Sequence, residues 1–246
     1  MYLTKTRVEK TSGKINLSNK FQLSTKKLFR SVSESTNNYH VKPSPGRPHI
    51  PSWLVLRSYQ TQAITNWFKS NGRGTLKMAT GSGKTITALS IACELYKQIQ
   101  LQVLLVVCPY RHLVTQWGRE CEKFNLQPIL AFESVSTWQS QLTTQLYNIH
   151  SGTQQFLTII TTNSTLNTDS FQSQLRYLPE RTLIIGDEAH NLGAAKVEES
   201  LPRQVGLRLG LSATPERYYD DDGTQSLLSY FGAVIQPEFT LKDAIS

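Results

Sequence analysis

The stretch Ala79-Thr80-Gly81-Ser82-Gly83-Lys84-Thr85 decides the fold that this chain of 246 residues is expected to adopt. Residues 75–79 read as a short strand, and residues 84–98 read as a helix. In such a strand–loop–helix setting, glycines let backbone N–H groups approach phosphates, a lysine reaches the β and γ oxygens, and a threonine hydroxyl binds Mg²⁺. The stretch therefore predicts a phosphate loop whose nucleotide-binding residues are Thr80, Gly81, Ser82, Gly83, Lys84 and Thr85, with Thr85 also binding the metal.

One position departs from the strict form of this motif. A glycine is expected five residues before Gly83, and the chain has Met78 there. The flanking strand and helix are the context that a phosphate loop requires, so we retain the prediction despite the substitution.

A second motif, Asp187-Glu188-Ala189-His190, follows the apolar run Leu183–Ile185. An acidic pair after a strand is often only a solvated turn, so on its own it is weak evidence for a metal site. Here it occurs together with a phosphate loop, and the two motifs in one chain indicate a nucleotide site. A carboxylate in this position can hold the water shell of a metal ion, and its neighbour can orient an attacking water. We therefore expect Lys84, Asp187 and Glu188 to be the catalytic residues, with Asp187 binding Mg²⁺ and Glu188 acting as the base.

Apolar strands alternate with helical stretches along the chain from about residue 51. Such alternation predicts an α/β fold, in which a parallel central sheet is flanked by helices on both faces. Ligands of these sheets bind at the carboxyl ends of the strands, where both motifs lie, so the two can converge on one nucleotide. Strands are expected at 75–79, 102–107, 128–132, 156–161, 181–186 and 207–212, and helices at 84–98, 112–124 and 134–148.

Composition is ordinary for a globular protein, with 39% hydrophobic residues and three cysteines in no metal-binding pattern. The cysteines are expected to be reduced. No apolar run is long enough to span a membrane, and the N-terminus has no apolar block typical of a signal peptide. These features predict an intracellular protein, cytoplasmic in a prokaryote, that is neither secreted nor embedded in a membrane.

The positive charge is concentrated in residues 1–50, which hold ten Lys or Arg and two Glu, while residues 51–246 hold 16 of each sign. A basic, polar arm suits contact with a phosphate backbone, although a merely solvated arm or an organelle transit peptide has the same composition. Alternation over residues 15–23 allows a small β element, and prolines at 43–51 indicate a linker. We expect an arm and linker at 1–50, a folded domain at 51–236 and a connecting segment at 237–246.

Taken together, the motifs resemble the first RecA-like motor domain of a superfamily 2 helicase or translocase. Within that superfamily, the chain resembles the branch that carries a DEAH box and that includes restriction motor subunits and repair helicases. The resemblance covers roughly residues 54–235, and in that family the glycine replaced by Met78 is not required. The matching motifs are 56–60 (adenine reader), 79–85 (phosphate loop), 108–117 (motif Ia), 187–190 (DEAH box) and 212–214 (motif III).

The resemblance implies roles for residues outside the two main motifs. Gln60, supported by Arg57, would read the N6 and N7 edge of adenine, since an amide can bond both atoms. His190, Ser212, Ala213 and Thr214 would couple the nucleotide state to the grip on nucleic acid. The nucleic-acid contacts would come from Arg111, His112, Gln116 and Thr162. Independently of the resemblance, the spacing of Leu113, Val114 and Trp117 predicts that Trp117 lies on the buried face of the helix that carries Gln116.

The implied activity is an ATP hydrolase that uses ATP and Mg²⁺ to translocate along or unwind nucleic acid, DNA rather than RNA. The family closes a second RecA-like domain over the nucleotide, from the same chain or a partner, so this chain alone should be weakly active. Two other hypotheses stay open at this point. One is a nucleic-acid-binding or assembly module with ATP as a structural ligand, and the other is a GTPase or small-molecule kinase. Against the latter, the chain has no Asn-Lys-x-Asp guanine-binding motif.

Overall fold

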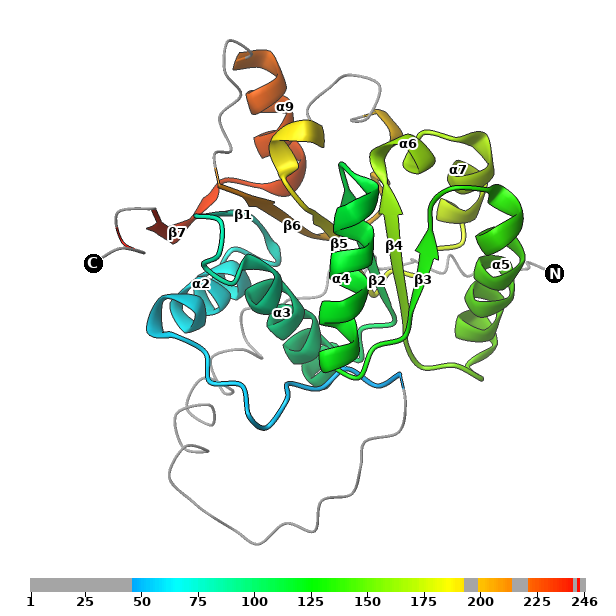
Figure 1. Cartoon of the computed structure of the whole chain (residues 1–246), viewed down its shortest axis with the longest axis horizontal. Coiled ribbons are helices and arrows are strands. Elements are labelled where there is room, and N and C mark those ends of the chain that lie inside the picture. Colours follow the sequence, from blue (N-terminus) through cyan, green and yellow to red (C-terminus); the bar gives the residue numbers. More distant parts are fainter. Residues whose placement is uncertain (1–45, 193–198, 214–220, 241–242, 244–246) are drawn as a thin grey trace, which may run out of the picture.

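The computed structural model describes residues 46–192, 199–213, 221–240 and 243 (Figure 1). The basic arm up to residue 45, with the β element expected at 15–23, lies outside the described residues. So do Thr214 and half of the segment expected at 237–246 to connect to a second domain, namely residues 241–242 and 244–246.

Within the described residues, seven parallel strands form one sheet in the order β3-β4-β2-β5-β6-β1-β7. Strand β2 is buried along its whole length between β4 and β5, which explains its unbroken run of apolar residues. The strands are β1 (Arg73–Met78), β2 (Val103–Cys108), β3 (Pro128–Ala131), β4 (Leu157–Thr162), β5 (Thr182–Gly186), β6 (Leu207–Ser212) and β7 (Val234–Phe239).

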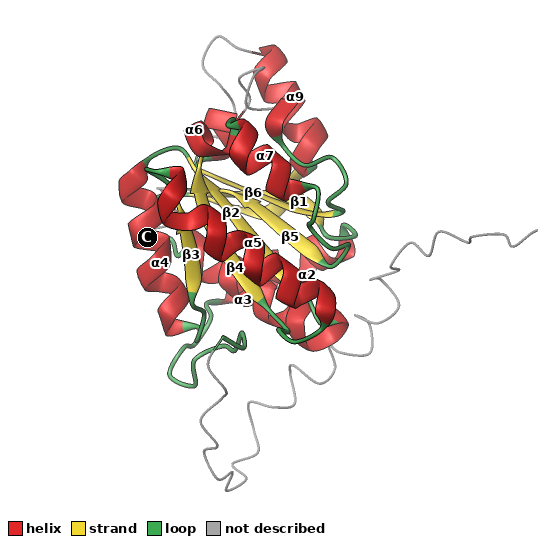
Figure 2. Cartoon of the chain, turned by 90° about the vertical axis from the view of Figure 1, so that its right-hand side faces the viewer, coloured by secondary structure: helices red, strands yellow, loops and turns green. Residues whose placement is uncertain are grey.

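Helices cover both faces of the sheet, each over its own apolar cluster. One cluster holds the buried side chains of α2, α3 and α4, and the other holds those of α5, α6, α7 and α9. Figure 2 shows α5 and α7 lying over the strands on the second face. The helices are α2 (Ser58–Lys69), α3 (Lys84–Ile99), α4 (Arg111–Lys123), α5 (Val135–Ser151), α6 (Asn163–Leu166), α7 (Asp169–Leu175) and α9 (Asp221–Phe231), with a 3₁₀ turn η1 at Ala189–Leu192.

The structure confirms the predicted α/β class and every predicted strand and helix, with bounds shifted by up to three residues. It adds elements that were not predicted, namely α2, α6, α7, α9 and β7. Strand β7 pairs with β1 and continues to Phe239, so the sheet crosses the domain boundary expected at 236. At the other end, the backbone N–H groups of Gly46 and His49 donate to the carbonyls of Asn125 and Phe124, so residues before 51 already pack on the domain.

Candidate nucleotide site

The phosphate loop and the DEAH box border one cavity of about 310 Å³ at the carboxyl ends of β1 and β5. The loop follows β1 and leads into α3, and the DEAH box follows β5 and leads into η1. Side chains of α4 close a third side. The lining residues are Thr80, Gly81, Gly83, Lys84, Thr85, Ile86, Leu113, Gln116, Glu120, Asp187 and Glu188.

Two glycines give the phosphate loop its shape. Gly81 and Gly83 have φ values of 80° and 86°, in the left-handed region where other residues are strained. A Cβ atom at Gly83 would also lie 2.5 Å from Nε2 of Gln60, so no other residue fits there without displacing the glutamine. The turn at Gly83 starts α3 at Lys84, which places the N-terminus of a 16-residue helix at the cavity.

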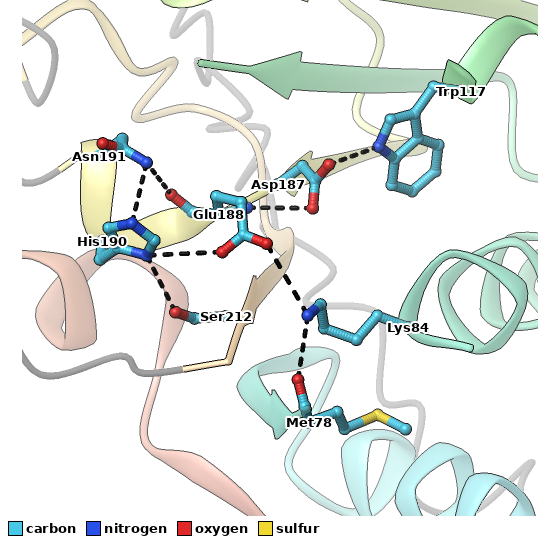
Figure 3. Close-up of polar contacts among 8 residues, drawn as sticks. All are labelled: Met78, Lys84, Trp117, Asp187, Glu188, His190, Asn191 and Ser212. Carbon is cyan, nitrogen blue, oxygen red and sulfur yellow. Dashed lines mark hydrogen bonds and ion pairs between the residues drawn. The ribbon is translucent and has the colours of Figure 1, made fainter. Parts of the chain in front are cut away.

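Lys84 reaches from the start of α3 to the end of β1 and to the DEAH box (Figure 3). Its ammonium donates to the backbone carbonyl of Met78 at 3.0 Å and forms an ion pair with Oε1 of Glu188 at 3.8 Å. Only the carbonyl of Met78 takes part, and its φ is not positive, so the position has no need of the glycine found in the strict motif. The departure noted in the sequence therefore has no structural cost.

Asp187 is held by two hydrogen bonds at the end of β5. The backbone N–H of Glu188 donates to Oδ1 at 3.0 Å, and the indole N–H of Trp117 donates to Oδ2 at 2.7 Å. Asp187 is 7% exposed. Burial raises the pKa of this carboxyl above its ordinary value, and the bond from Trp117 opposes that shift.

Glu188 lies at the centre of a polar network. It has a φ of 43°, which is unusual for a side chain of this size. The Asn191 amide donates to Nε2 of His190 at 3.0 Å, which leaves the imidazole proton on Nδ1. That nitrogen lies 3.6 Å from Oε2 of Glu188 and 3.2 Å from the hydroxyl of Ser212 (Figure 3). His190 therefore joins the DEAH box to the end of β6, where coupling was predicted; Ala213 follows directly.

Gln60 and Arg57, the predicted adenine readers, lie at the start of α2 beside the phosphate loop. Gln60 is buried, and its Oε1 accepts from the backbone N–H of Arg57 at 2.9 Å while its Nε2 donates to the carbonyl of Ser82 at 3.3 Å. The hydroxyl of Tyr59 donates to the same carbonyl at 2.6 Å. The amide nitrogen of Gln60 thus braces the loop while its oxygen caps the start of α2, and the adenine contact stays a prediction.

The predicted nucleic-acid residues fall in three different environments. Arg111 and His112 are exposed at the start of α4, next to Tyr110, which is 55% exposed. Gln116, one helical turn further on, lines the nucleotide cavity instead. Thr162 is 3% exposed, and its hydroxyl caps α6 by accepting from the N–H of Thr165. The structure therefore does not present Thr162 for a surface contact, because the hydroxyl is occupied inside the fold.

Sequence reasoning missed several residues at this site. Trp117 was expected in the core, where it lies, but nothing in the sequence indicated its bond to Asp187. Glu120 follows Gln116 by one helical turn on α4, so the i, i+4 spacing could have placed it at the cavity. Phe239 stacks on Tyr59 with ring centroids 3.9 Å apart, across a separation of 180 residues that no local pattern reports.

The donor set at the cavity fits Mg²⁺. A group of three or more His, Cys, Asp or Glu side chains that could cage a metal is absent from the described residues. The cavity instead offers the Asp187 carboxylate and the Thr85 hydroxyl. Magnesium prefers oxygen ligands and is commonly bound by one or two protein groups together with substrate phosphates and water.

The parallel sheet, the phosphate loop and the DEAH box together define a RecA-like nucleotide-binding domain of the superfamily 2 helicase class. Within that class, residues 54–217 match the family described as "Type III restriction enzyme, res subunit", and the chain belongs to it. None of its described helices is long and apolar enough to cross a membrane.

Curated relatives are longer than this chain. The DNA 3'-5' translocase XPB2 of Sulfurisphaera tokodaii is 32% identical over 184 residues, which are 73% of this chain and 35% of that protein. A putative DNA 3'-5' helicase Rad25 of Haloarcula marismortui is 27% identical over 171 residues, which are 69% of this chain and 24% of that protein. The chain thus spans about a third or less of these relatives.

Solved structures share the fold at lower identity. The ATP-dependent Type ISP restriction-modification enzyme LlaBIII bound to DNA superposes with a TM-score of 0.57 at 24% identity, covering 78% of this chain and 16% of that one. The Sulfolobus solfataricus SWI2/SNF2 ATPase core in complex with dsDNA gives a TM-score of 0.55 at 21% identity, covering 76% and 37%.

Proposed function

We propose that this chain is the ATP-binding half of a motor that couples ATP hydrolysis to translocation along DNA or to its unwinding. The observation that carries the proposal is the meeting of Lys84, Asp187 and Glu188 at one cavity, although Lys84 and the acidic pair are a hundred residues apart. That arrangement supplies a cation for phosphate, a carboxylate for a metal and a second carboxylate for water.

Each group has a defined part in the proposed chemistry. The loop N–H groups and the Lys84 ammonium bind the β and γ phosphates, and Thr85 and Asp187 hold the Mg²⁺ ion. When bound, the ion neutralises charge that develops on the phosphates. Glu188 orients the attacking water and accepts its proton. His190 contacts both Glu188 and Ser212, so a change at Glu188 on hydrolysis is transmitted to the end of β6.

DNA is the proposed track. The relative from Sulfurisphaera tokodaii is named a DNA translocase, and the names of both fold neighbours include DNA. In this chain, Arg111 and His112 are exposed at the start of α4, where side chains and helix N–H groups can bind phosphates without reading sequence.

Full turnover is proposed to need a second RecA-like domain. In motors of this kind such a domain contributes arginines that stabilise charge on the γ-phosphate, an effect of roughly 10³–10⁵ in rate. The chain alone should therefore bind Mg-ATP weakly and hydrolyse it slowly. Steady-state ATPase activity with and without DNA tests this, and fast DNA-stimulated turnover by a verified monomer would show that no second domain is required.

The non-enzymatic alternative rests on the charge of the arm, which carries the whole net charge of +8. In that case the arm would bind nucleic acid and ATP would only stabilise the fold. ATP hydrolysis measured after fusion to a second RecA-like domain separates the two functions, because a structural ligand would still not be turned over.

A further inference from the structure

The carboxylate of Asp187 is fixed from a second element of the fold, in addition to its own strand. One oxygen accepts from the adjacent backbone at Glu188, and the other accepts the indole N–H of Trp117 on α4 at 2.7 Å (Figure 3). A carboxylate has about four acceptor positions, so two remain for other ligands after these bonds are made. Asp187 also borders the cavity, where those positions can be used.

We propose that Trp117 is a positioning residue for the proposed metal site, and that its indole N–H sets the orientation in which the Asp187 carboxylate meets Mg²⁺. The proposal rests on the proposed function. The indole N–H of Trp117 bonds to Asp187 and not to the water-orienting Glu188, so Trp117 acts on the site through Asp187.

Packing makes the indole a rigid support. Trp117 is 1% exposed, and the buried residues of α4 around it, Val114 and Cys121, lie one turn before and one turn after it on the same face. The ring therefore cannot turn without repacking the cluster between α4 and the sheet. A hydrogen bond to a charged acceptor in such a site is short and strong, and groups that hold a ligating carboxylate tune the metal affinity.

The other tryptophans show that this bond is not a general consequence of burying an indole. Trp138 on α5 is also 1% exposed, yet its Nε1 has no partner in the described structure. Trp67 donates to the backbone carbonyl of Arg208 at 3.1 Å, and Trp53 is 65% exposed. Trp117 is thus distinguished by a charged acceptor, and Trp138 provides a matched control.

The first test uses ¹⁵N-labelled protein without nucleotide or metal, in which the four indole N–H groups give separate NMR signals. Trp117→Phe identifies its own signal, which we expect furthest downfield because a carboxylate accepts it. Asp187→Asn should move that signal upfield and leave those of Trp67 and Trp138 in place. A Trp117 signal that does not respond to Asp187→Asn would overturn the proposal.

The second test measures the Mg²⁺ concentration needed for half-maximal binding of a fluorescent, non-hydrolysable ATP analogue. Trp117→Phe keeps an aromatic ring and removes the N–H, and it should raise this concentration about tenfold, within the range found for groups behind metal ligands. Trp138→Phe makes the same change elsewhere and should leave it unchanged.

The outcomes separate the two claims. A wild-type protein that binds the analogue without any dependence on Mg²⁺ contradicts the proposed function itself. A clear dependence in the wild type that Trp117→Phe does not alter, or that both variants alter equally, contradicts only the positioning role.

Discussion

The ammonium of Lys84 lies 3.8 Å from Oε1 of Glu188, so the expected phosphate-binding residue and the expected base are already in contact. Their side chains are 10% and 27% exposed, which limits screening by solvent. A triphosphate entering the cavity would offer Lys84 more acceptors and more charge than one carboxylate does. Nucleotide binding is therefore expected to release Glu188 towards the attacking water.

Lys84→Ala should abolish detectable triphosphate binding while leaving the fold intact. The substitution removes the ammonium that bonds Met78 and Glu188 and that would bind the phosphates. Affinity for a fluorescent ATP analogue and the thermal unfolding midpoint should be measured together. Lys97→Ala is the matched control, because Lys97 lies on the same helix and pairs with Glu94 away from the cavity. Equal loss in both variants would assign the effect to α3 rather than to Lys84.

Glu188→Gln should retain nucleotide binding and remove hydrolysis in the complete motor. The amide keeps the shape of the side chain but cannot accept the proton of the attacking water. It also ends the competition for Lys84, so affinity should equal or exceed that of the wild type. Analogue binding by this chain and ATP turnover by the complete motor are the two measurements. A loss of binding as large as that of Lys84→Ala would contradict the assigned roles.

Gln60→Ala should weaken ATP binding by roughly 5–150-fold and reduce the preference for ATP over GTP. The estimate follows from about 1–3 kcal/mol for losing buried hydrogen-bond partners. Part of the loss of affinity is expected because the carbonyl of Ser82 loses its hydrogen bond from Gln60, and part because the predicted contact with adenine is removed. Gln62→Ala, on the exposed side of the same helix, serves as the control. If ATP and GTP affinities fall equally, Gln60 supports the loop and does not select the base.

Deletion of residues 1–45 should lower DNA affinity at low salt and make it less dependent on salt. Removing one ion pair with a phosphate reduces the slope of log affinity against log salt by about 0.9 on duplex DNA. The deletion should stop before Gly46, because the backbone from Gly46 to His49 bonds to the loop after α4. Unchanged affinity and slope would show that the arm does not bind DNA.

The raised pKa of Asp187 gives the metal-free protein a stability that falls as pH rises. Burial makes the folded state bind the proton more tightly than the unfolded chain, whose carboxyl titrates near the ordinary value of 3.8. Stability is therefore highest below the unfolded pKa and decreases as pH rises through the folded pKa. Urea unfolding of the wild type and of Asp187→Asn across that interval should show this slope in the wild type alone. Equal slopes would place the effect on other groups.

Strong local patterns made most of the sheet predictable. Unbroken apolar runs such as Val103–Val107 and Leu183–Ile185 became strands buried on both sides, and the glycines of the phosphate loop fixed the start of α3. Helix α2 was missed although Ala63, Ile64, Trp67 and Phe68 follow a helical spacing. The polar residues at its start resemble a nucleotide motif and by themselves indicate a binding segment rather than a helix.

Other features could not be predicted because they depend on contacts between distant segments. Strand β7 holds Gln236, Pro237 and Glu238 and is only partly buried, so it lacks an apolar run. The acidic run at 220–222 is typical of a loop, yet helix α9 begins within it at Asp221. At the site, motif spacing predicted that Lys84, Asp187 and Glu188 would meet. It could not predict that Gln116 would face the nucleotide cavity or that Thr162 would be buried as a helix cap.

Phe239 ends β7 with its ring stacked on Tyr59, and its carbonyl accepts from the backbone N–H of Ala79 at 2.7 Å. Tyr59 in turn bonds the carbonyl of Ser82. The point at which the chain leaves the sheet is thus one aromatic pair away from the turn that would enclose the triphosphate. Mechanical load applied beyond Thr240 would act on Phe239 and reach this turn through Tyr59 and Ala79, so a pulling force is expected to change how long the nucleotide stays bound.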